Sequence, residues 1–383
     1  MDYVFPNDLH VHWTVMIVLY PYITGLVAGA FIVSSLYHVF GREALQPVAR
    51  FSLAAAFVFL LFAPLPLLIH LGRPERAFSI MITPNFSSAM AGFGFIYTSY
   101  LILVVLEIWF VMRSDFIQRA KGAGLGALIA RTILLFNLHE DDATRRADHK
   151  IAKVLAGIGI PMACLLHGYV GFLFGSIKAN PWWSTPLMMV IFLFSAIVSG
   201  ISVLIFHYFV VSWVNRWKVD SDCVRLMSKY LWGFMIVAVS LEVLELMSAA
   251  YQQTHEWEVI HTLVSKHLFV SYVILQFLVF SLIPFFLLAF NSLARSTDRV
   301  SNAISWTAAT MLLCQVLLMR WNVVIGGQIM SKSFRGFTSY FPGLWEKEGL
   351  VTAIVVFTLP FVLLYLFHRL VPLFPDAKKR SAA

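Results

Sequence analysis

The chain has 383 residues, of which 60% are hydrophobic and only 13% are charged. Soluble domains carry roughly 25% charged residues, so this composition excludes an ordinary water-soluble protein and predicts one that crosses a membrane many times. The formal net charge of +8 would also suit a nucleic-acid-binding protein, but basic residues in a membrane protein chiefly set its orientation.

Apolar segments long enough to span a bilayer, about 20 residues each, follow one another along the chain. We expect them at about 14–40, 50–71, 88–112, 150–176, 187–213, 228–251, 266–290, 302–325 and 350–371. Polar segments containing Gly and Pro separate them. The sequence therefore predicts an all-α polytopic membrane protein, with residues 1–383 forming a single integral membrane domain of about nine transmembrane helices in a bundle.

Two segments affect the number of spans. The N-terminal MDYVFPNDLHVHW contains no Lys or Arg, so it lacks the basic start of a signal peptide, and the first apolar segment is expected to remain as a span. Residues 113–149 are long and charged, and we interpret them as a cytoplasmic loop. Within that loop, 122–138 is apolar but short and carries Arg131, which favours an interfacial helix over a tenth span.

The basic residues are distributed unevenly between the two sides of the membrane. Of the 28 Lys and Arg residues, 18 follow the odd-numbered spans and 7 fall on the opposite side. Positively charged loops stay in the cytoplasm, so the N-terminus is predicted to face outside and the C-terminus inside. This bias explains the net charge by topology, and a nucleic-acid partner is not expected.

With this orientation, the unusual polar segments gather on the outer face. They are NDLHVHW, HLGRPER, KANPWW, YQQTHEWEVIHT and GGQIMSKSFRGFTSYFPG, and half of the 12 histidines lie in or near them: His10, His12, His70, His255, His261 and His267. The outer face is therefore predicted to be the functional one. Trp13, Trp182 and Trp183 are typical of the aromatic belt at a membrane interface.

Charged side chains inside predicted spans are costly and indicate a function or a partner. Glu242 and Glu245 are three residues apart on one helix face in the outer half of span six. Arg320, near the outer end of span eight, is their candidate counter-ion. Two interpretations stay open: an ion pair that ties two helices together, or protonatable groups that serve a site at the outer face. Glu107 lies near the inner end of span three, where its side chain can snorkel to water.

The cysteines and histidines do not indicate a metal centre. Cys164, Cys223 and Cys314 are far apart, whereas iron–sulfur clusters and structural zinc sites need clustered thiolates. Haem b needs two histidines at matching depth on facing helices. His167 lies in the outer half of span four and the other histidines within spans lie near inner ends, which favours a hydrogen-bonded packing role for His167. We therefore expect no metal, haem or iron–sulfur cluster in this chain.

Small residues mark a close helix contact in span one. The stretch GLVAGA places Gly25 and Gly29 four residues apart, on one face of the helix. Such spacing lets a second helix approach closely, so we expect a tight crossing at these glycines.

Four stretches together resemble the NrfD/polysulfide reductase membrane-subunit family, the quinone-interacting integral subunits of respiratory oxidoreductases. They are YPYITGLVAGAFIVSSLYHV, HLGRPERAF, HGYVGFLFGSIKANPWWSTPLMMVIFLFSAIVSG and RWNVVIGGQ. Their order and spacing carry the resemblance from near the N-terminus to about residue 330.

The resemblance implies a helical bundle in a bacterial or archaeal cytoplasmic membrane that binds menaquinone or ubiquinone near the extracytoplasmic face. It implies a docked iron–sulfur ferredoxin-like subunit that exchanges electrons with the quinone, and a molybdopterin or multihaem cytochrome subunit beyond it. Membrane lipid and quinone are then the remaining partners, and the chain would be a subunit of an oxidoreductase complex without a catalytic cofactor of its own.

The resemblance also suggests the site residues. A polar residue and a His before the first span and a Tyr in the fourth span help to form the family's quinone site, and by position these are Asn7, His10 or His12, and Tyr169. His70 and Arg73 of HLGRPER are expected to line the quinone pocket or the docking surface. Coupled proton movement would use Glu242, Glu245, Arg320 and Glu107.

Two other functions remain open at this point. Buried Glu and Arg also suit an ion or proton transporter, which inverted repeats would support, but the two halves show no clear repeat. The chain would otherwise be a membrane anchor that holds a complex without contacting quinone.

Overall fold

The computed structural model describes residues 10–374 except 255, 295, 332–333 and 335. The described residues form helices and no strand, apart from an isolated bridge between Met330 and Phe337. In this described part of the chain, nine helices are long and apolar enough to cross a membrane. The prediction of an all-α protein with nine spans is confirmed.

The spanning helices follow the predicted order. They are α1 (Val15–His38), α2 (Gln46–Phe62) continued by α3 (Leu65–His70), α5 (Ala89–Ala120), α7 (Asp142–Gly175), α8 (Leu187–Asn215), α9 (Ser221–Gln252), η4 (Phe269–Leu282) continued by α11 (Ile283–Leu293), α12 (Asp298–Val324) continued by α13 (Gly326–Ile329), and α14 (Leu350–Leu370). Shorter helices in the connections are η1 (Glu43–Leu45), η2 (Pro74–Arg76), α4 (Ser79–Ile82), α6 (Leu125–Ile133), α10 (Trp257–Thr262) and η3 (Leu263–His267).

The segment 113–149 is shorter as a loop than the sequence suggests, because α5 and α7 both extend into it. In the sequence, charged residues such as Arg113 and Asp148 suggest that the spans end there. In the structure they form an ion pair between the two helices, with Arg113 Nη1 3.1 Å from Asp148 Oδ2. The side chain of Asp141 caps α7 by accepting a hydrogen bond from the Thr144 N–H at 2.7 Å. Helix α6 lies within the remaining segment, and its placement at a membrane surface stays a prediction.

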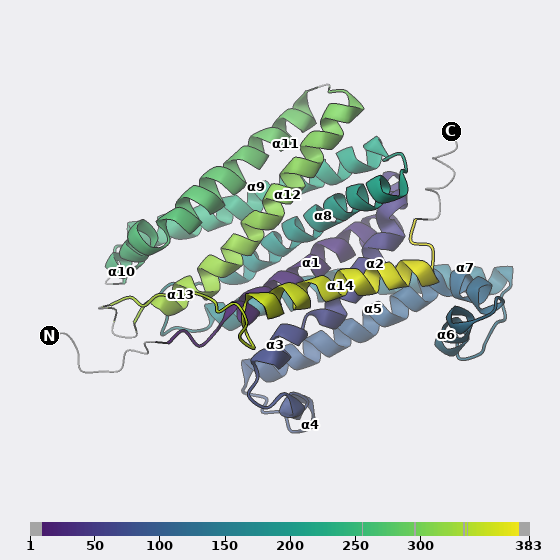
Figure 1. The fold of residues 1–383 in the computed structure, drawn as a ribbon, viewed down its shortest axis with the longest axis horizontal. Helices are drawn as coiled ribbons and strands as arrows, with labels where there is room; N and C mark the ends of the chain where they lie inside the picture. Colours follow the sequence, from purple (N-terminus) through teal and green to yellow (C-terminus); the bar gives the residue numbers. More distant parts are fainter. Residues whose placement is uncertain (1–9, 255, 295, 332–333, 335, 375–383) are drawn as a thin grey trace.

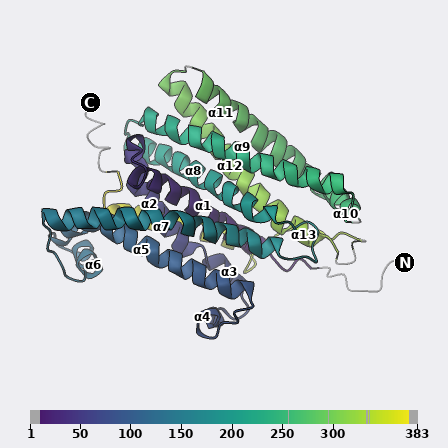
Figure 2. The same ribbon diagram turned by 180° about the vertical axis from the view of Figure 1, so that it is seen from behind.

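The spanning helices form two bundles. Helices α1, α2, α5 and α7 pack together as the first bundle, and α8, α9, η4 with α11, and α12 pack together as the second bundle. The bundles meet where α8 packs against α1 and α7, while α14 lies against α2 and α1. Figures 1 and 2 show the second bundle above the first in both views, with the two helix sets running side by side.

The two bundles touch backbone to backbone where α1 crosses α8. A Cβ atom on Gly29 would lie 2.4 Å from the Ile197 carbonyl oxygen, and one on Gly200 would lie 2.5 Å from the Gly29 Cα. At Gly25 the approach is looser, because an added Cβ would lie 3.3 Å from the Ser199 hydroxyl. The close contact predicted from GLVAGA is confirmed, and its tightest point is Gly29.

We call the end of the molecule at which α1 begins the N-terminal end. Helices α3, α4, α10 and α13 lie at this end, whereas α6 and the connection between α11 and α12 lie at the opposite end (Figure 1). The alternation of helix directions thus brings the segments after the even-numbered spans together beside the start of α1, as the sequence predicts. Which end faces outward stays a prediction.

Candidate functional site

The residues predicted to bind quinone lie at the N-terminal end, except that Asn7 falls outside the described residues. The described members of this set are His10, His12, His70, Arg73 and Tyr169. The two histidines before α1 are exposed, as is Arg73, whereas His70 and Tyr169 are half-buried. No described hydrogen bond joins His70, Arg73 and Tyr169 to one another, so the structure brings these residues to one end without linking them by hydrogen bonds.

His70 has an acidic partner that sequence reasoning missed. Its Nδ1 lies 2.8 Å from Glu348 Oε2, and the Thr14 hydroxyl donates to the same carboxylate oxygen. This contact joins the end of α3, the start of α1 and the segment before α14. Glu348 gave no signal in the sequence because it follows His70 by 278 positions and lies in a segment, FPGLWEKEG, that resembles an ordinary turn.

Tyr169 is held near the start of α5. Its hydroxyl donates to the Ala89 carbonyl at 2.8 Å, which leaves the oxygen able to accept a second hydrogen bond. A Cβ on Gly92 would lie 2.4 Å from this hydroxyl, so glycine at that position makes room for it. The tyrosine is thus fixed in position at the N-terminal end of the molecule.

Two tryptophans at this end, half-buried Trp182 and buried Trp183, are hydrogen-bond donors. The indole N–H groups of Trp182 and Trp183 donate to the carbonyls of Asn322 and Val323 at 3.0 and 2.6 Å. Trp183 is 5% exposed and stacks on Trp13 with 5.1 Å between ring centroids. The interpretation of these residues as an aromatic belt is therefore wrong for Trp183. The hydrogen bonds of Trp182 and Trp183 instead link the stretch KANPWW to the stretch RWNVVIGGQ. Both stretches belong to the segments that carry the family resemblance.

Glu242 takes part in a buried polar chain in the second bundle. Its Oε2 accepts from Gln276 Nε2 at 2.7 Å, Gln276 Oε1 accepts from Asn322 Nδ2 at 2.8 Å, and Asn322 Oδ1 accepts from the Ser271 hydroxyl at 2.8 Å. Glu242 is 4% exposed, and its other carboxylate oxygen accepts no hydrogen bond of good geometry in the described part of the chain, although the Gln315 side chain lies nearby. One acceptor is therefore left over in a buried site.

Arg320 joins two helices instead of forming a direct ion pair. Its Nη2 donates to the Ser195 hydroxyl at 2.8 Å and to the Phe192 carbonyl at 3.3 Å, and the guanidinium carbon lies 3.8 Å from the Phe192 ring centroid. Among the described residues, no ion pair of 4 Å or less connects it to Glu242 or Glu245. The guanidinium and Glu242 still attract each other at longer range.

Glu107 is buried in the first bundle. It is 0% exposed, and neither carboxylate oxygen has a hydrogen-bond partner within the described residues. The snorkelling interpretation is wrong, because α5 continues for more than three turns beyond Glu107 and carries it into the protein interior. Glu107 and Glu242 therefore lie in different bundles.

His167 is a packing residue, as predicted. Its Nδ1 lies 2.7 Å from the Ala163 carbonyl, and its Nε2 contacts the Thr24 carbonyl of α1. The ring thus fills the contact between α7 and α1. Within the described residues, no group of three or more His, Cys, Asp or Glu side chains is placed to hold a metal ion.

A cavity of about 360 Å³ lies in the second bundle, between α8, α9, η4 and α12. It reaches from the connection after α9 to Glu242, and Glu245, Tyr272 and Gln276 line it as well. Helix η4 is π-helical, a rare form that often marks functional sites, and it turns Tyr272 and Gln276 towards the cavity. Sequence reasoning found the two glutamates but missed Tyr272 and Gln276, which lie in an otherwise apolar run.

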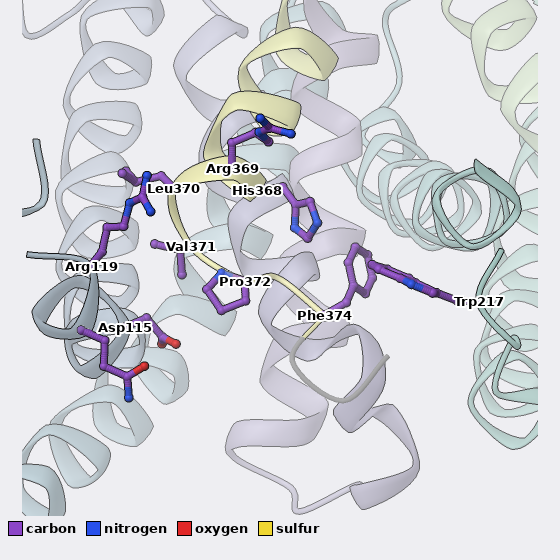
Figure 3. A pocket seen from close by; sticks show the side chains of 10 residues that line it. Asp115, Arg119, Trp217, His368, Arg369, Leu370, Val371, Pro372 and Phe374 are labelled. Atoms are coloured by element: carbon purple, nitrogen blue, oxygen red, sulfur yellow. The ribbon is translucent and has the colours of Figure 1, made fainter. Parts of the chain in front are cut away.

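A second cavity, of about 480 Å³, lies at the opposite end (Figure 3). Side chains from the end of α5 and the end of α14 line it, among them Arg119, His368 and Arg369. The carboxylate of Asp115, also in its wall, is paired with Arg50. This basic cavity lies at the end that the distribution of Lys and Arg assigns to the cytoplasm.

Comparison with known proteins agrees with the resemblance seen in the sequence. The family described as polysulphide reductase, NrfD, matches residues 6–332. The C subunit of the selenate reductase of Mesobacillus selenatarsenatis is 33% identical over 250 residues, which cover 63% of this chain and 58% of that subunit. Protein NrfD of Escherichia coli is 25% identical over 234 residues, 59% of this chain and 70% of that protein.

An archaeal relative matches along more of the chain. The Hdr-like menaquinol oxidoreductase integral membrane subunit of Archaeoglobus fulgidus is 21% identical over 350 residues, 89% of this chain and 75% of that subunit. By contrast, the chain spans less than two thirds of the selenate reductase subunit. Since the family match extends over most of the sequence and all but the last of the nine spanning helices in the described part of the chain, this protein belongs to the NrfD, or polysulphide reductase, family.

Proposed function

We propose that this chain is the quinone-interacting membrane subunit of a respiratory oxidoreductase, and that it exchanges electrons between the membrane quinone pool and an iron–sulfur subunit. Family membership over residues 6–332 is the observation that carries this proposal. The relatives support it by their names, which include a reductase subunit and a menaquinol oxidoreductase subunit. A molybdopterin or multihaem cytochrome subunit would complete the complex, and the last name favours menaquinone over ubiquinone.

The quinone headgroup is proposed to bind at the N-terminal end, near His70 and Tyr169. A quinone needs hydrogen-bond donors when it is reduced, and a quinol needs acceptors when it is oxidised; a histidine offers both. The contact of 2.8 Å between His70 and Glu348 supports this role, because a carboxylate fixes the orientation of the imidazole and accepts its proton. His10 and His12 precede α1 at the same end, and exposed Arg73 is proposed to contact the partner subunit.

We expect the N-terminal end to face away from the cytoplasm. A reporter that is active only in the cytoplasm should be active when fused after Ala383, because 18 of the 28 Lys and Arg residues follow the odd-numbered spans. A reporter that is active only outside should be silent at the same position. Activity of the external reporter at this position would reverse the orientation and place the proposed headgroup site on the cytoplasmic side.

Protons are proposed to move through the buried carboxylates. Oxidation of a quinol releases two protons, so a headgroup that binds away from water needs titratable neighbours. Glu107 lies in the first bundle with Tyr169, whereas Glu242, Glu245 and Arg320 lie in the second bundle. The chain from Glu242 through Gln276 and Asn322 supports a proton route in the second bundle.

The proposal is tested on the whole complex, purified with its partner subunits and reconstituted into vesicles. Added menadiol should reduce the iron–sulfur clusters, seen by electron paramagnetic resonance, and should release protons. The Glu245→Gln variant should assemble normally but slow both signals. An assembled complex whose clusters menadiol never reduces would identify the chain as an anchor, and ion flux without any quinol would identify it as a transporter.

A further inference from the structure

We propose that the cavity beside Glu242 is a second ligand site, which binds the hydroxyl-bearing ring of a hydroquinone in preference to the oxidised quinone. This inference rests on the proposed function, because that function brings the chain into contact with the quinol pool. It concerns binding alone, and no electron transfer is assigned to this site.

The charge of the cavity selects a ligand that donates hydrogen bonds. Glu242, Glu245 and Glu256 line it, and its described lining residues include no Lys, Arg or His. A hydroquinone carries two O–H donors and no charge, whereas a quinone offers only acceptors. In their ionised form, these carboxylates therefore accept hydrogen bonds from the reduced ring and repel the carbonyl oxygens of the oxidised ring.

The deep end of the cavity holds a buried carboxylate oxygen to which no described residue donates a hydrogen bond of good geometry. This oxygen is Oε1 of Glu242, which is 4% exposed and lines the cavity, and the Gln315 side chain lies near enough to interact with the same carboxylate. Gln276 holds the other oxygen at 2.7 Å, which fixes the carboxylate in position. Buried polar atoms are normally satisfied, so a ligand hydroxyl is well suited to this oxygen.

The walls suit an aromatic ring. Trp182 and Tyr272 line the cavity in an edge-to-face arrangement, with 5.6 Å between ring centroids. Met188, Ile191 and Met319 add apolar surface around the same space. The volume of about 360 Å³ lies in the range, from about 300 to 1,000 Å³, that holds small organic ligands in proteins.

The cavity is separate from the proposed headgroup site at His70 and Tyr169. It belongs to the second bundle, and the stacked pair of Trp13 and Trp183 joins the segment before α1 to the segment before α8. Glu242 precedes the end of α9 by 10 residues, a depth of roughly 15 Å from the N-terminal end. Met247 on the outer surface of α9 is 60% exposed, so this helix faces the lipid from which a quinol would arrive.

The test counts bound rings on the purified complex under anaerobic conditions. Menadiol and menadione, the reduced and oxidised forms of one tail-less ring, are measured by equilibrium dialysis. We expect the complex to bind one more equivalent of menadiol than of menadione per chain. Ala249→Trp, which fills the cavity, should abolish that extra equivalent, and Glu242→Gln should weaken it by about tenfold because a hydrogen bond to a charged acceptor is lost.

The matched control is Met247→Trp, which adds the same side chain to the same helix but outside the cavity, and which should keep the extra equivalent. If Ala249→Trp binds as much menadiol as the unmodified complex, or if menadiol and menadione bind equally, the second site is wrong. A single equivalent of menadiol that only His70→Ala removes would also overturn the second site while leaving the proposed function intact. A complex that binds no menadiol at all would contradict both.

Discussion

Replacing Gly29 with alanine is expected to destabilise the folded chain by about 3 kcal/mol, near the upper end of the usual cost of overpacking. The added Cβ would lie 2.4 Å from the Ile197 carbonyl oxygen, 2.7 Å from the Gly200 Cα and 2.7 Å from the Ile201 nitrogen. All three are backbone atoms of α8, so no side chain can rotate away, and the two bundles must separate. The thermal unfolding midpoint in detergent and the yield of assembled complex measure the effect.

The control is Gly25→Ala, one turn earlier on the same face of α1. Its nearest neighbour is the Ser199 hydroxyl at 3.3 Å, a side-chain atom that can move by a few tenths of an ångström. We expect this variant to change stability by less than about 1 kcal/mol. Equal behaviour of the two variants would mean that the bundles do not depend on the crossing at Gly29.

The fold was predictable because a bilayer requires long apolar segments, which a sequence displays directly. The four-residue spacing of Gly25 and Gly29 also predicted a close crossing, although its partner glycine in SAIVSG could not be chosen from spacing alone. The prediction was least accurate at the ends of α5 and α7. Charges such as Arg113 and Asp148 resemble the start of a loop in a sequence, but here they pair across two helices that continue beyond them.

The candidate site was only partly predictable, for a different reason. A lone histidine in HLGRPER shows that a polar group lies at the end of a span, but its partner Glu348 is a matter of tertiary structure. Tyr272 and Gln276 could not be found from the pattern, because neutral polar residues in an apolar run give no periodic signal. Their four-residue spacing puts them on one face of the helix, but that this face meets the cavity is a matter of tertiary packing.

The separation into two bundles changes how the buried charges relate to the headgroup site. From the sequence, one interpretation of Glu242 and Glu245 was that they serve a site at the outer face, where Tyr169 and the N-terminal histidines were also expected. The structure places them in the second bundle, beyond α1 and α8, and places Glu107 in the first bundle instead. Within the proposed function, Glu107 is therefore the buried carboxylate that shares a bundle with Tyr169. Glu242 lines the separate cavity in the second bundle.

Removing the side chains at the proposed headgroup site is expected to abolish quinol turnover. His70→Ala and Tyr169→Phe should each lower quinol-dependent reduction of the partner by about a hundredfold or more, the usual cost of losing a positioned proton donor or acceptor. Both residues are half-buried at the N-terminal end, and neither supports the contact at Gly29, so the complex should still assemble. Turnover with menadiol, normalised to the amount of assembled complex, is the measurement.

Glu348 separates a proton-handling role of His70 from a merely structural one. Glu348→Gln keeps a hydrogen-bond acceptor 2.8 Å from His70 but removes the carboxylate charge. If the carboxylate helps His70 to exchange a proton with the quinone, this variant should lower quinol turnover per assembled complex without lowering the amount of assembled complex. Glu346→Gln removes a charge from the same segment, where the carboxylate is exposed, and should leave turnover unchanged. Unchanged kinetics in both His70→Ala and Tyr169→Phe would mean that the headgroup binds elsewhere. A loss of turnover that only follows the amount of assembled complex would mean that the contact of His70 and Thr14 with Glu348 is structural, and that it holds α3, α1 and the segment before α14 together.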